Sequence, residues 1–298
     1  MGAKKTTRKT GKLKVNATVS VDEDRLTMEE VQAIRSRLIP DDTHAVMRRA
    51  GPSTRIVAEG DSWFDYLPGL DVLMQLRRRH GYSIHSVATA GDTLENMAFG
   101  TRIDRKFQRE TQPLDRTLAA IREHKPRIVL LSGGGNDLAG TEFEAYLNHK
   151  DSGLTPLLRK GYLKETLKAF EIAYSHIVSE IWKVDDEIHV ILHGYGYPVP
   201  DGRAVINFPL GFRFVGPWLR PALAKKNITS RQEGTGILVE LIDEFNSMLS
   251  AFASGDPRLH YINLRDSIGD DDWVNELHLK NSAYGRVADL FHEEILTI

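Results

Sequence analysis

The stretch IVAEGDSWFDYLPG, residues 56–69, decides the fold class of this chain. It begins with a short apolar run and reaches a Gly-Asp-Ser turn at Ser62. An apolar run without polar alternation is typical of a strand that is buried on both faces of a parallel sheet. The stretch therefore predicts a buried strand whose carboxyl end presents a small hydroxyl at the edge of a sheet.

From Arg55 onward, short β-rich runs alternate with longer helical stretches, which predicts an α/β fold with a parallel sheet between two layers of helices. In such sheets, ligands bind beyond the carboxyl ends of the strands. The expected strands are RIVAEG (55–60), YSIHSVATAG (82–91), PRIVLLSGGG (126–135), EIHVILHGYG (187–196) and RLHYINLRDS (258–267). The expected helices are 69–80, 114–124, 162–183, 234–253 and 281–297.

The composition limits the chemistry and the partners of the protein. Lys and Arg number 39 against 41 Asp and Glu in 298 residues, and this balance gives no reason to expect a nucleic-acid or anionic-membrane partner. The absence of cysteine excludes disulfides, thiolate metal sites and cysteine nucleophiles. The acidic run Asp270 to Asp272 lacks the ligand spacing of a calcium loop, so no metal site is expected there.

The N-terminal region differs from the rest of the chain. Residues 1–22 are basic and lack the apolar core of a secretory signal, which predicts a disordered, solvated tail. Residues 23–53 are expected to form a helical extension, because Thr27 and Glu30 fit a capping box. The α/β domain then occupies residues 54–298. No apolar run approaches the roughly 18 residues of a transmembrane helix, so the default expectation is a cytoplasmic protein.

Polar residues follow glycine at the ends of three expected strands. The sequences are Gly60-Asp61-Ser62, Gly91-Asp92-Thr93 and the run from Gly133 to Asp137. A lone serine in such a place is usually a helix cap or a turn residue. A serine nucleophile also needs a base and hydrogen-bond donors for an oxyanion. The N–H groups of Ser62 and Gly91 and the side-chain amide of Asn136 could converge to supply those donors.

Among the 11 histidines, His278 is the strongest candidate for the base. It lies in DDDWVNELHLKNSAYG, residues 270–285, after the last expected strand and before the last helix. This loop should return to the edge of the sheet where Ser62 lies. His193, at the end of the fourth strand, is the alternative base, although a pocket-shaping or buried structural role suits it better.

These residues together resemble a known family. EGDSW around Ser62, TAGDT around Gly91, GGGND around Asn136 and NELH ending at His278 resemble, in order and spacing, the four blocks of the SGNH (GDSL-like) hydrolases. The resemblance covers about residues 54–298. It implies a three-layer, flavodoxin-like α/β/α sandwich with a five-stranded sheet in the order 2-1-3-4-5.

The resemblance also implies a chemistry. Members of this family hydrolyse esters of lipids, acylated sugars and other acyl compounds, and no metal or organic cofactor is implied. By resemblance, Ser62 is the nucleophile and His278 the general base. The oxyanion hole would consist of the N–H groups of Ser62 and Gly91 and the amide of Asn136.

One position departs from the family pattern. The family usually has Asp three residues before the catalytic histidine, and this chain has Asn275 there. An amide can orient an imidazole but adds no negative charge to stabilise imidazolium. Asp272 is the first choice for a substitute carboxylate, and Glu276 or a backbone carbonyl is the alternative.

Aromatic residues suggest where a substrate binds. Residues 197–236 form a long excursion, rich in Pro and Gly, which is either a lid over Ser62 or a surface loop with its own apolar cluster. Trp63 and Phe64 either line the pocket or pack beneath the loop. The candidate substrate-binding residues are Trp63, His193, Phe212 and Trp218.

Three functions agree with these features. The first is a serine-dependent ester hydrolase that acts on a small-molecule acyl ester. The second is an acyltransferase on the same scaffold, in which an alcohol replaces water. The third is a catalytically impaired binding or assembly module, a hypothesis that Asn275 and the N-terminal segment motivate.

Overall fold

A computed structural model describes residues 55–66, 71–204, 206–207, 213–214 and 216–298 of the chain. Its centre is a parallel sheet of five strands in the order β2-β1-β3-β4-β7, which confirms the predicted order 2-1-3-4-5 when the strands of this sheet are counted along the chain. The strands are β1 (Arg55–Gly60), β2 (Ser83–Ser86), β3 (Ile128–Ser132), β4 (His189–His193) and β7 (Leu259–Ile262).

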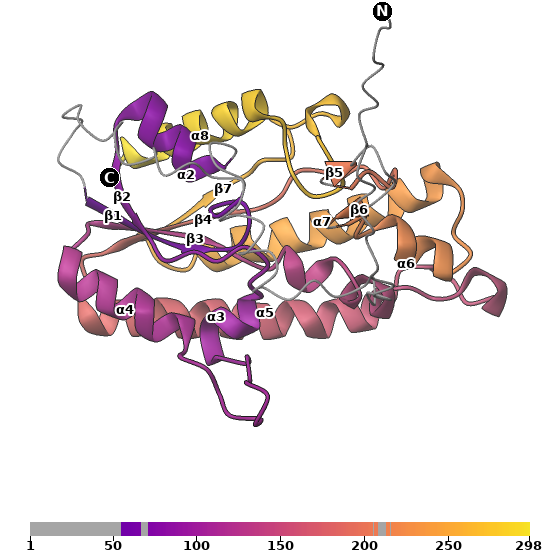
Figure 1. Cartoon of the computed structure of the whole chain (residues 1–298), viewed down its shortest axis with the longest axis horizontal. Helices are drawn as coiled ribbons and strands as arrows, with labels where there is room; N and C mark the ends of the chain where they lie inside the picture. The colour runs from indigo at the N-terminus through magenta and orange to yellow at the C-terminus, as the bar shows by residue number, and fades with distance from the viewer. Residues whose placement is uncertain (1–54, 67–70, 205, 208–212, 215) are drawn as a thin grey trace, which may run out of the picture.

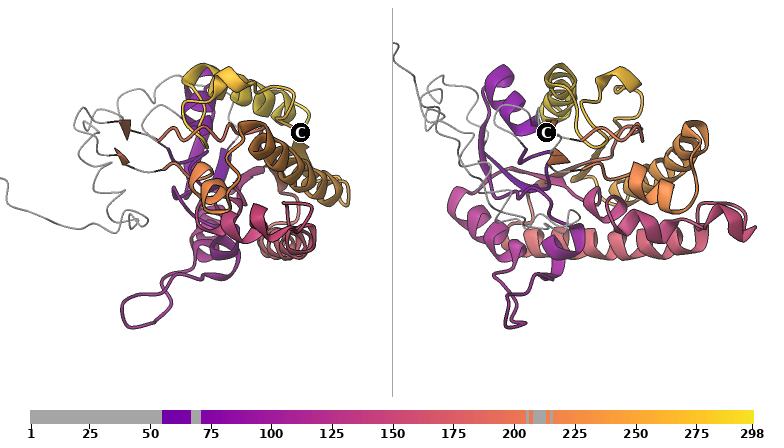
Figure 2. Two further views of the ribbon diagram at one scale, coloured as in Figure 1. Left: turned by 90° about the vertical axis from the view of Figure 1, so that its right-hand side faces the viewer. Right: turned by 45° about the vertical axis from the view of Figure 1, so that its right-hand side comes forward.

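Helices cover both faces of the sheet (Figures 1 and 2). On one face, α2 (Val72–Gln75) and the π-helical turn Leu76–His80 that continues it pack against α8 (Asn281–Ile295). The other face carries α3 (Leu94–Phe99), α4 (Pro113–His124), α5 (Lys160–Val184) and α7 (Arg231–Ala253). The predicted three-layer sandwich is therefore confirmed.

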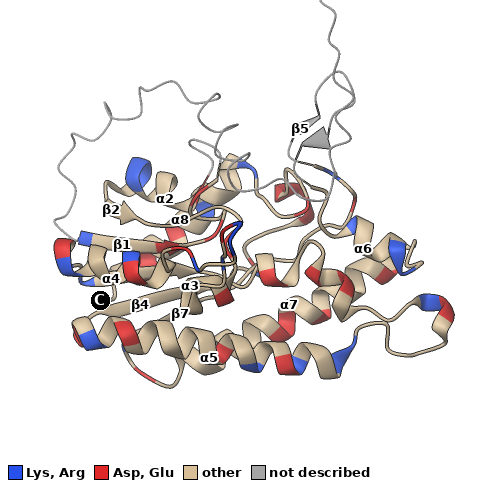
Figure 3. Cartoon of the chain, turned by 60° about the horizontal axis from the view of Figure 1, so that its bottom comes forward, with Lys and Arg blue, Asp and Glu red and all other residues tan. Residues whose placement is uncertain are grey.

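The distribution of apolar and charged side chains explains the layers. Every residue of β3 is buried, and so is every residue of β1 after Arg55, so the central strands have no solvent-facing side. Figure 3 shows charges of both signs along α5, where they lie on the outer surface of the layer. Burial of the strands between two amphipathic layers stabilises the sheet mainly through the hydrophobic effect. None of the helices in the described ranges is both long and apolar enough to cross a bilayer.

The predicted elements differ from the observed ones chiefly at their ends. The expected strand 82–91 contributes only Ser83–Ser86 to the sheet, and the residues after it form the loop that carries Gly91. Several short elements were not predicted because each is too short for a periodic pattern. These are α3, α6 (Arg220–Lys225), the antiparallel pair β5 (Ile206–Asn207) and β6 (Arg213–Phe214), and the 3-10 turns Asn136–Leu138, Glu142–Tyr146, Lys150–Ser152 and Asp270–Asp272.

Two glycines near the carboxyl edge of the sheet, one at the end of β1 and one in the loop after β2, occupy positions that favour glycine. A Cβ atom on Gly60 would lie 2.7 Å from Cβ of Ser132 on the neighbouring strand, so only glycine fits where β1 leaves the sheet. Gly91 has a φ of 76°, a left-handed conformation that glycine adopts without strain. Both positions lie at the carboxyl edge of the sheet, where the polar residues of the candidate site gather. The basic tail and the helical extension that the sequence predicts lie outside the described residues.

Candidate active site

Ser62, His278 and Asn275 form a hydrogen-bonded row at the carboxyl edge of the sheet. The Ser62 hydroxyl lies 2.9 Å from Nε2 of His278, and Nδ1 of the same ring lies 3.0 Å from Oδ1 of Asn275. The serine comes from the loop after β1 and the other two residues from the loop before α8. Residues 216 positions apart in the sequence thus meet within hydrogen-bonding distance.

The hydrogen bonds around Asn275 determine which ring nitrogen of His278 carries the proton. Oδ1 of Asn275 accepts hydrogen bonds from the backbone N–H groups of Leu277 at 3.0 Å and His278 at 2.9 Å, so the side-chain oxygen faces this turn. Because Nδ1 contacts the same oxygen, it must be the protonated nitrogen, and Nε2 is left to accept the Ser62 hydrogen. This tautomer is the one that a general base for serine requires.

Burial strongly disfavours the charged form of His278. The side chain is 3% exposed, and desolvation lowers the pKa of His278 from 6.5 to about 3. Asn275 is also buried and carries no charge to offset this effect. The ring is therefore neutral at physiological pH, which suits a base. Position 275 has an amide and no carboxylate, so no negative charge there stabilises the imidazolium form.

The two carboxylates that the sequence offered as substitutes make other contacts. Oδ2 of Asp272 accepts hydrogen bonds from Gly269 N at 2.8 Å and from Arg286, whose Nη2 lies 2.6 Å away. Glu276 is fully buried, and both its oxygens accept backbone N–H groups from another segment. The donors are Gly202, Trp218, Leu219 and Arg220, at 2.6 to 3.0 Å. The structure thus places Asn275, and neither of these carboxylates, at Nδ1 of His278.

Glu276 links the turn that holds His278 to the excursion 197–236. Four N–H groups on one carboxylate offset much of the cost of burying its charge. Burial nevertheless raises the pKa of Glu276, with the backbone hydrogen bonds opposing that shift. The carboxylate therefore fixes residues 202 and 218–220 against the loop that carries His278.

Asp61 fixes the shape of the turn that carries Ser62. Its carboxylate accepts hydrogen bonds from Trp63 N at 3.0 Å, Ser132 Oγ at 2.7 Å and the Tyr195 hydroxyl at 2.7 Å. The group is buried, and desolvation raises the pKa of Asp61. Because these donors come from β3, from the loop after β4 and from its own turn, Asp61 fixes Ser62 relative to the sheet.

The candidate oxyanion donors come from three strand ends. Nδ2 of Asn136 donates to the Asp92 carbonyl at 2.8 Å, and an amide nitrogen carries a second hydrogen that this bond does not use. Gly91 lies directly before Asp92, so the same bond ties the Asn136 side chain to the Gly91 loop. Asp137 accepts the backbone N–H of Leu94 at 2.8 Å and holds that loop from the other side.

His193 and Trp63 lie mainly in the core. His193 is fully buried, its ring stacks on Trp63 with centroids 5.4 Å apart, and desolvation lowers the pKa of His193 to about 4. Its Nδ1 lies 2.7 Å from the Gly194 carbonyl, whereas the imidazole at the Ser62 hydroxyl is that of His278. Trp63 is 3% exposed, donates its indole N–H to the Leu277 carbonyl at 3.2 Å, and lines the cavity described below.

Two further aromatic rings contact His278. The Tyr66 ring is stacked on the imidazole with centroids 3.8 Å apart and planes at 10°, and the Trp218 ring meets it at 5.5 Å and 66°. Trp218 was a candidate from the sequence, whereas Tyr66 was missed. The only signal for Tyr66 was its position four residues after Ser62, in the same turn. The third aromatic candidate, Phe212, lies outside the described residues.

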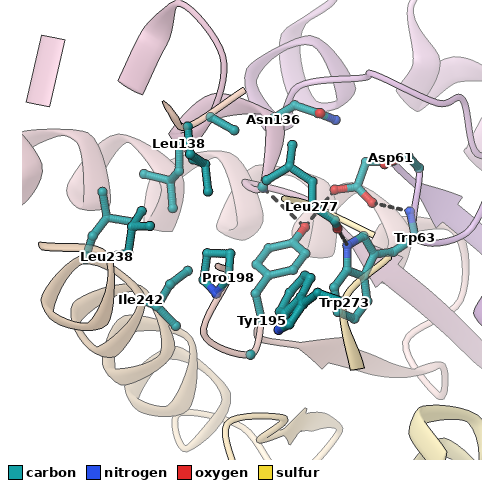
Figure 4. A pocket seen from close by; sticks show the side chains of 16 residues that line it. Asp61, Trp63, Asn136, Leu138, Tyr195, Pro198, Leu238, Ile242, Trp273 and Leu277 are labelled. Atoms are coloured by element: carbon teal, nitrogen blue, oxygen red, sulfur yellow. Dashed lines mark hydrogen bonds between the residues drawn. The ribbon is translucent and has the colours of Figure 1, made fainter. Parts of the chain in front are cut away.

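A small, mostly apolar cavity opens beside Ser62 (Figure 4). Its volume is about 50 Å³, and Ser62, Asn136 and Trp63 are among the residues that line it. Helix α7 closes it on one side, and Pro198 and Leu219 of the excursion 197–236 contribute to the wall. Its apolar lining includes Leu138, Leu219, Leu238, Leu241, Ile242 and Leu277. Within the part of the chain that the structure describes, no three His, Asp or Glu side chains are arranged to hold a metal ion.

The fold is similar to that of solved esterases and lipases. No family model and no curated protein sequence matches this chain. The lipase Lip_vut3 from a goat rumen metagenome is 14% identical over 81% of this chain and 97% of its own, with a TM-score of 0.50. An inhibitor-bound aryl esterase of M. smegmatis is 10% identical over 82% and 99%, with a TM-score of 0.49. A family 3 carbohydrate esterase of Clostridium thermocellum is 15% identical over 82% and 97%, with a TM-score of 0.44. At these identities the likeness concerns the fold alone.

Proposed function

We propose that the protein is a serine-dependent ester hydrolase of the SGNH type. The observation that carries the proposal is the row from Ser62 through His278 to Asn275, in which the tautomer of the ring leaves Nε2 free to accept the serine proton. Fold similarity to a lipase supports ester hydrolysis as the reaction class. The four sequence blocks that resemble this family contain Ser62, Gly91, Asn136 and His278.

The proposed reaction has two acyl-transfer steps. Ser62 Oγ attacks the ester carbonyl carbon while its proton passes to Nε2 of His278, and Asn136 with the Ser62 and Gly91 N–H groups stabilises the oxyanion. The C–O bond to the alcohol breaks, and His278 returns the proton to the leaving oxygen. Water then attacks the acyl-enzyme, gives its proton to His278, and the acid leaves as Ser62 recovers the proton.

The cavity beside Ser62 supports a short acyl group as the substrate. Because a water needs roughly 10–15 Å³ of such space, a volume of about 50 Å³ holds only about four atoms of that size. Apolar side chains from α7 would pack against the hydrocarbon part of an acetyl to butyryl group. An ester with a long acyl chain would need Leu238 or Ile242 to move.

The test of the function is hydrolysis of p-nitrophenyl esters from acetate to dodecanoate by wild type and Ser62→Ala. The proposal predicts turnover of the short esters by wild type, its loss in Ser62→Ala with an unchanged circular dichroism spectrum, and labelling of wild type alone by a fluorophosphonate. Wild-type turnover in Ser62→Ala would contradict the role of this serine.

Two further readouts separate the alternatives. A folded wild type that neither turns over esters nor reacts with the fluorophosphonate would favour a binding module, which the uncharged Asn275 motivates. Added alcohols distinguish an acyltransferase, because they would then divert most of the acyl group into a new ester instead of the free acid.

A further inference from the structure

The face of the Tyr66 ring covers the imidazole of His278. The two centroids lie 3.8 Å apart and the planes differ by 10°, so the rings are in direct van der Waals contact. Nδ2 of Asn275 donates a hydrogen bond of 3.3 Å to the Tyr66 hydroxyl, which fixes the ring from its far end. Burial raises the pKa of Tyr66 to about 12, so that hydroxyl is neutral. One tyrosine therefore contacts both the base and the residue that orients it.

This stack becomes important at the moment when His278 takes a proton. The imidazolium that forms is buried, and desolvation already disfavours it strongly. The face of an aromatic ring has a negative electrostatic potential that attracts a cation, and the attraction grows where water is excluded. The Tyr66 face thus stabilises the imidazolium more than it stabilises the neutral imidazole.

The carboxylates of Asp272, Glu276 and Asp61 interact with groups other than the His278 ring. Asp272 pairs with Arg286, Glu276 accepts the backbone N–H groups of residues 202 and 218–220, and Asp61 accepts from Trp63, Ser132 and Tyr195. The described groups that contact the imidazole side chain through a hydrogen bond or a ring contact are Ser62, Tyr66, Trp218 and Asn275, all of them uncharged.

We propose that Tyr66 is a positioning residue that stabilises the imidazolium form of His278 through its ring face and so replaces part of the effect of the carboxylate missing at Asn275. This inference rests on the proposed function. It concerns a residue that is argued to act through its contact with His278.

The test compares Tyr66→Phe with Tyr66→Leu. Phenylalanine keeps the ring face and removes the hydroxyl, so kcat should stay within about threefold of wild type. Leucine removes the ring face, so kcat for p-nitrophenyl acetate should fall roughly tenfold to thirtyfold, the range of a desolvated cation–π contact. Tyr162→Leu, on the surface of α5 and 48% exposed, is the matched control and should leave kcat unchanged. Equal losses in Tyr66→Phe and Tyr66→Leu would overturn a role for the ring face.

A double-mutant cycle with Asn275→Asp separates this role from simple packing. A carboxylate at position 275 supplies negative charge, so the loss in kcat from Tyr66→Leu should shrink at least threefold in that background. If Tyr66→Leu costs the same factor with Asn275 and with Asp at 275, the ring only packs and the inference is wrong.

A readout that does not depend on catalysis distinguishes failure of this inference from failure of the proposed function. In the Asn275→Asp background, NMR titration of the His278 ring should give a pKa about one unit lower with Tyr66→Leu than with Tyr66 intact. An unchanged pKa would overturn the inference even in an active enzyme. A lowered pKa would support it even if no ester is turned over, in which case only the proposed function fails.

Discussion

Oδ1 of Asn275 lies 3.0 Å from Nδ1 of His278, and the same oxygen accepts the backbone N–H groups of Leu277 and His278. Three N–H groups therefore converge on one neutral oxygen in a buried turn. The group that faces Nδ1 of the imidazole therefore orients the ring but carries no negative charge. Orientation and charge can thus be tested separately at position 275.

Asn275→Asp should preserve or raise kcat at neutral pH and move the acid limb of kcat/KM toward neutral pH. The carboxylate would accept the same N–H groups and would also stabilise imidazolium, which raises the pKa of His278. In wild type that pKa lies near 3, so activity should persist as the pH falls below 6.5. The measurement is kcat/KM for a short p-nitrophenyl ester between pH 4 and 9.

The acid side of that profile needs a stability control. A histidine whose pKa is lowered in the folded state costs stability as the pH falls below its unfolded value of 6.5, because the unfolded chain takes up the proton first. Circular dichroism at each pH therefore has to show a folded protein. A tenfold or larger loss of kcat in folded Asn275→Asp would mean that a charge at this position hinders the reaction.

Asp272→Asn should change kcat by less than about threefold. The carboxylate pairs with Arg286, whose side chain is 48% exposed, and such partly exposed pairs contribute about 0–1 kcal/mol to stability. Steady-state kinetics and urea unfolding of the variant measure the two effects. A loss of orders of magnitude in kcat, with the fold intact, would show that Asp272 supplies charge to His278 during the reaction.

Asn136→Ala should lower kcat by roughly 10²–10³ with little change in KM, because one donor to the oxyanion is lost. Asn136 also donates to the Asp92 carbonyl, so a melting curve has to confirm that the Gly91 loop keeps its place. Asn263→Ala, at an exposed position after β7, is the control and should behave as wild type. An effect confined to KM would assign Asn136 to substrate binding alone.

Glu276→Gln should destabilise the fold and lower kcat together. An amide has one accepting oxygen, so two of the four backbone N–H groups would face an NH₂ group in place of a carboxylate oxygen. Buried donors without an acceptor cost about 1–3 kcal/mol each, so urea unfolding should report a loss of about 2–6 kcal/mol for the two. Glu171→Gln, on the exposed face of α5, should leave both stability and kcat unchanged. Full stability in Glu276→Gln would show that the link to residues 202 and 218–220 contributes little.

Glu59→Gln should make the protein more stable than wild type at pH 8 and about equally stable at pH 4.5. Desolvation raises the pKa of this buried residue from 4.5 to about 8, so between these values the folded state keeps a proton that the unfolded state releases. Wild-type stability should therefore fall as the pH rises through this window, by at most about 1.4 kcal/mol per pH unit from this group. Glutamine can keep the contacts with Gly60 N and Thr117 without titrating.

Urea unfolding at pH 4.5, 5.5, 6.5 and 8 measures this difference, with Glu187→Gln at an exposed position as the control. If the free energies of unfolding of wild type and Glu59→Gln change in parallel with pH, Glu59 does not keep its proton in the folded state.

The sequence by itself determined the α/β class, the strand order through its family resemblance, and the meeting of Ser62 with His278. Short runs of Val, Ile and Leu that end at glycine predict strands buried on both faces of a sheet, and parallel strands bring their carboxyl ends to one edge. Tertiary structure alone decided which group faces Nδ1 of His278. That choice depends on the path of residues 270–278, where Asp272 turns to Arg286, Glu276 binds residues 202 and 218–220, and Asn275 is left at the ring. The stack of Tyr66 on His278 was equally hidden, because it joins residues 212 positions apart through packing that no local pattern encodes.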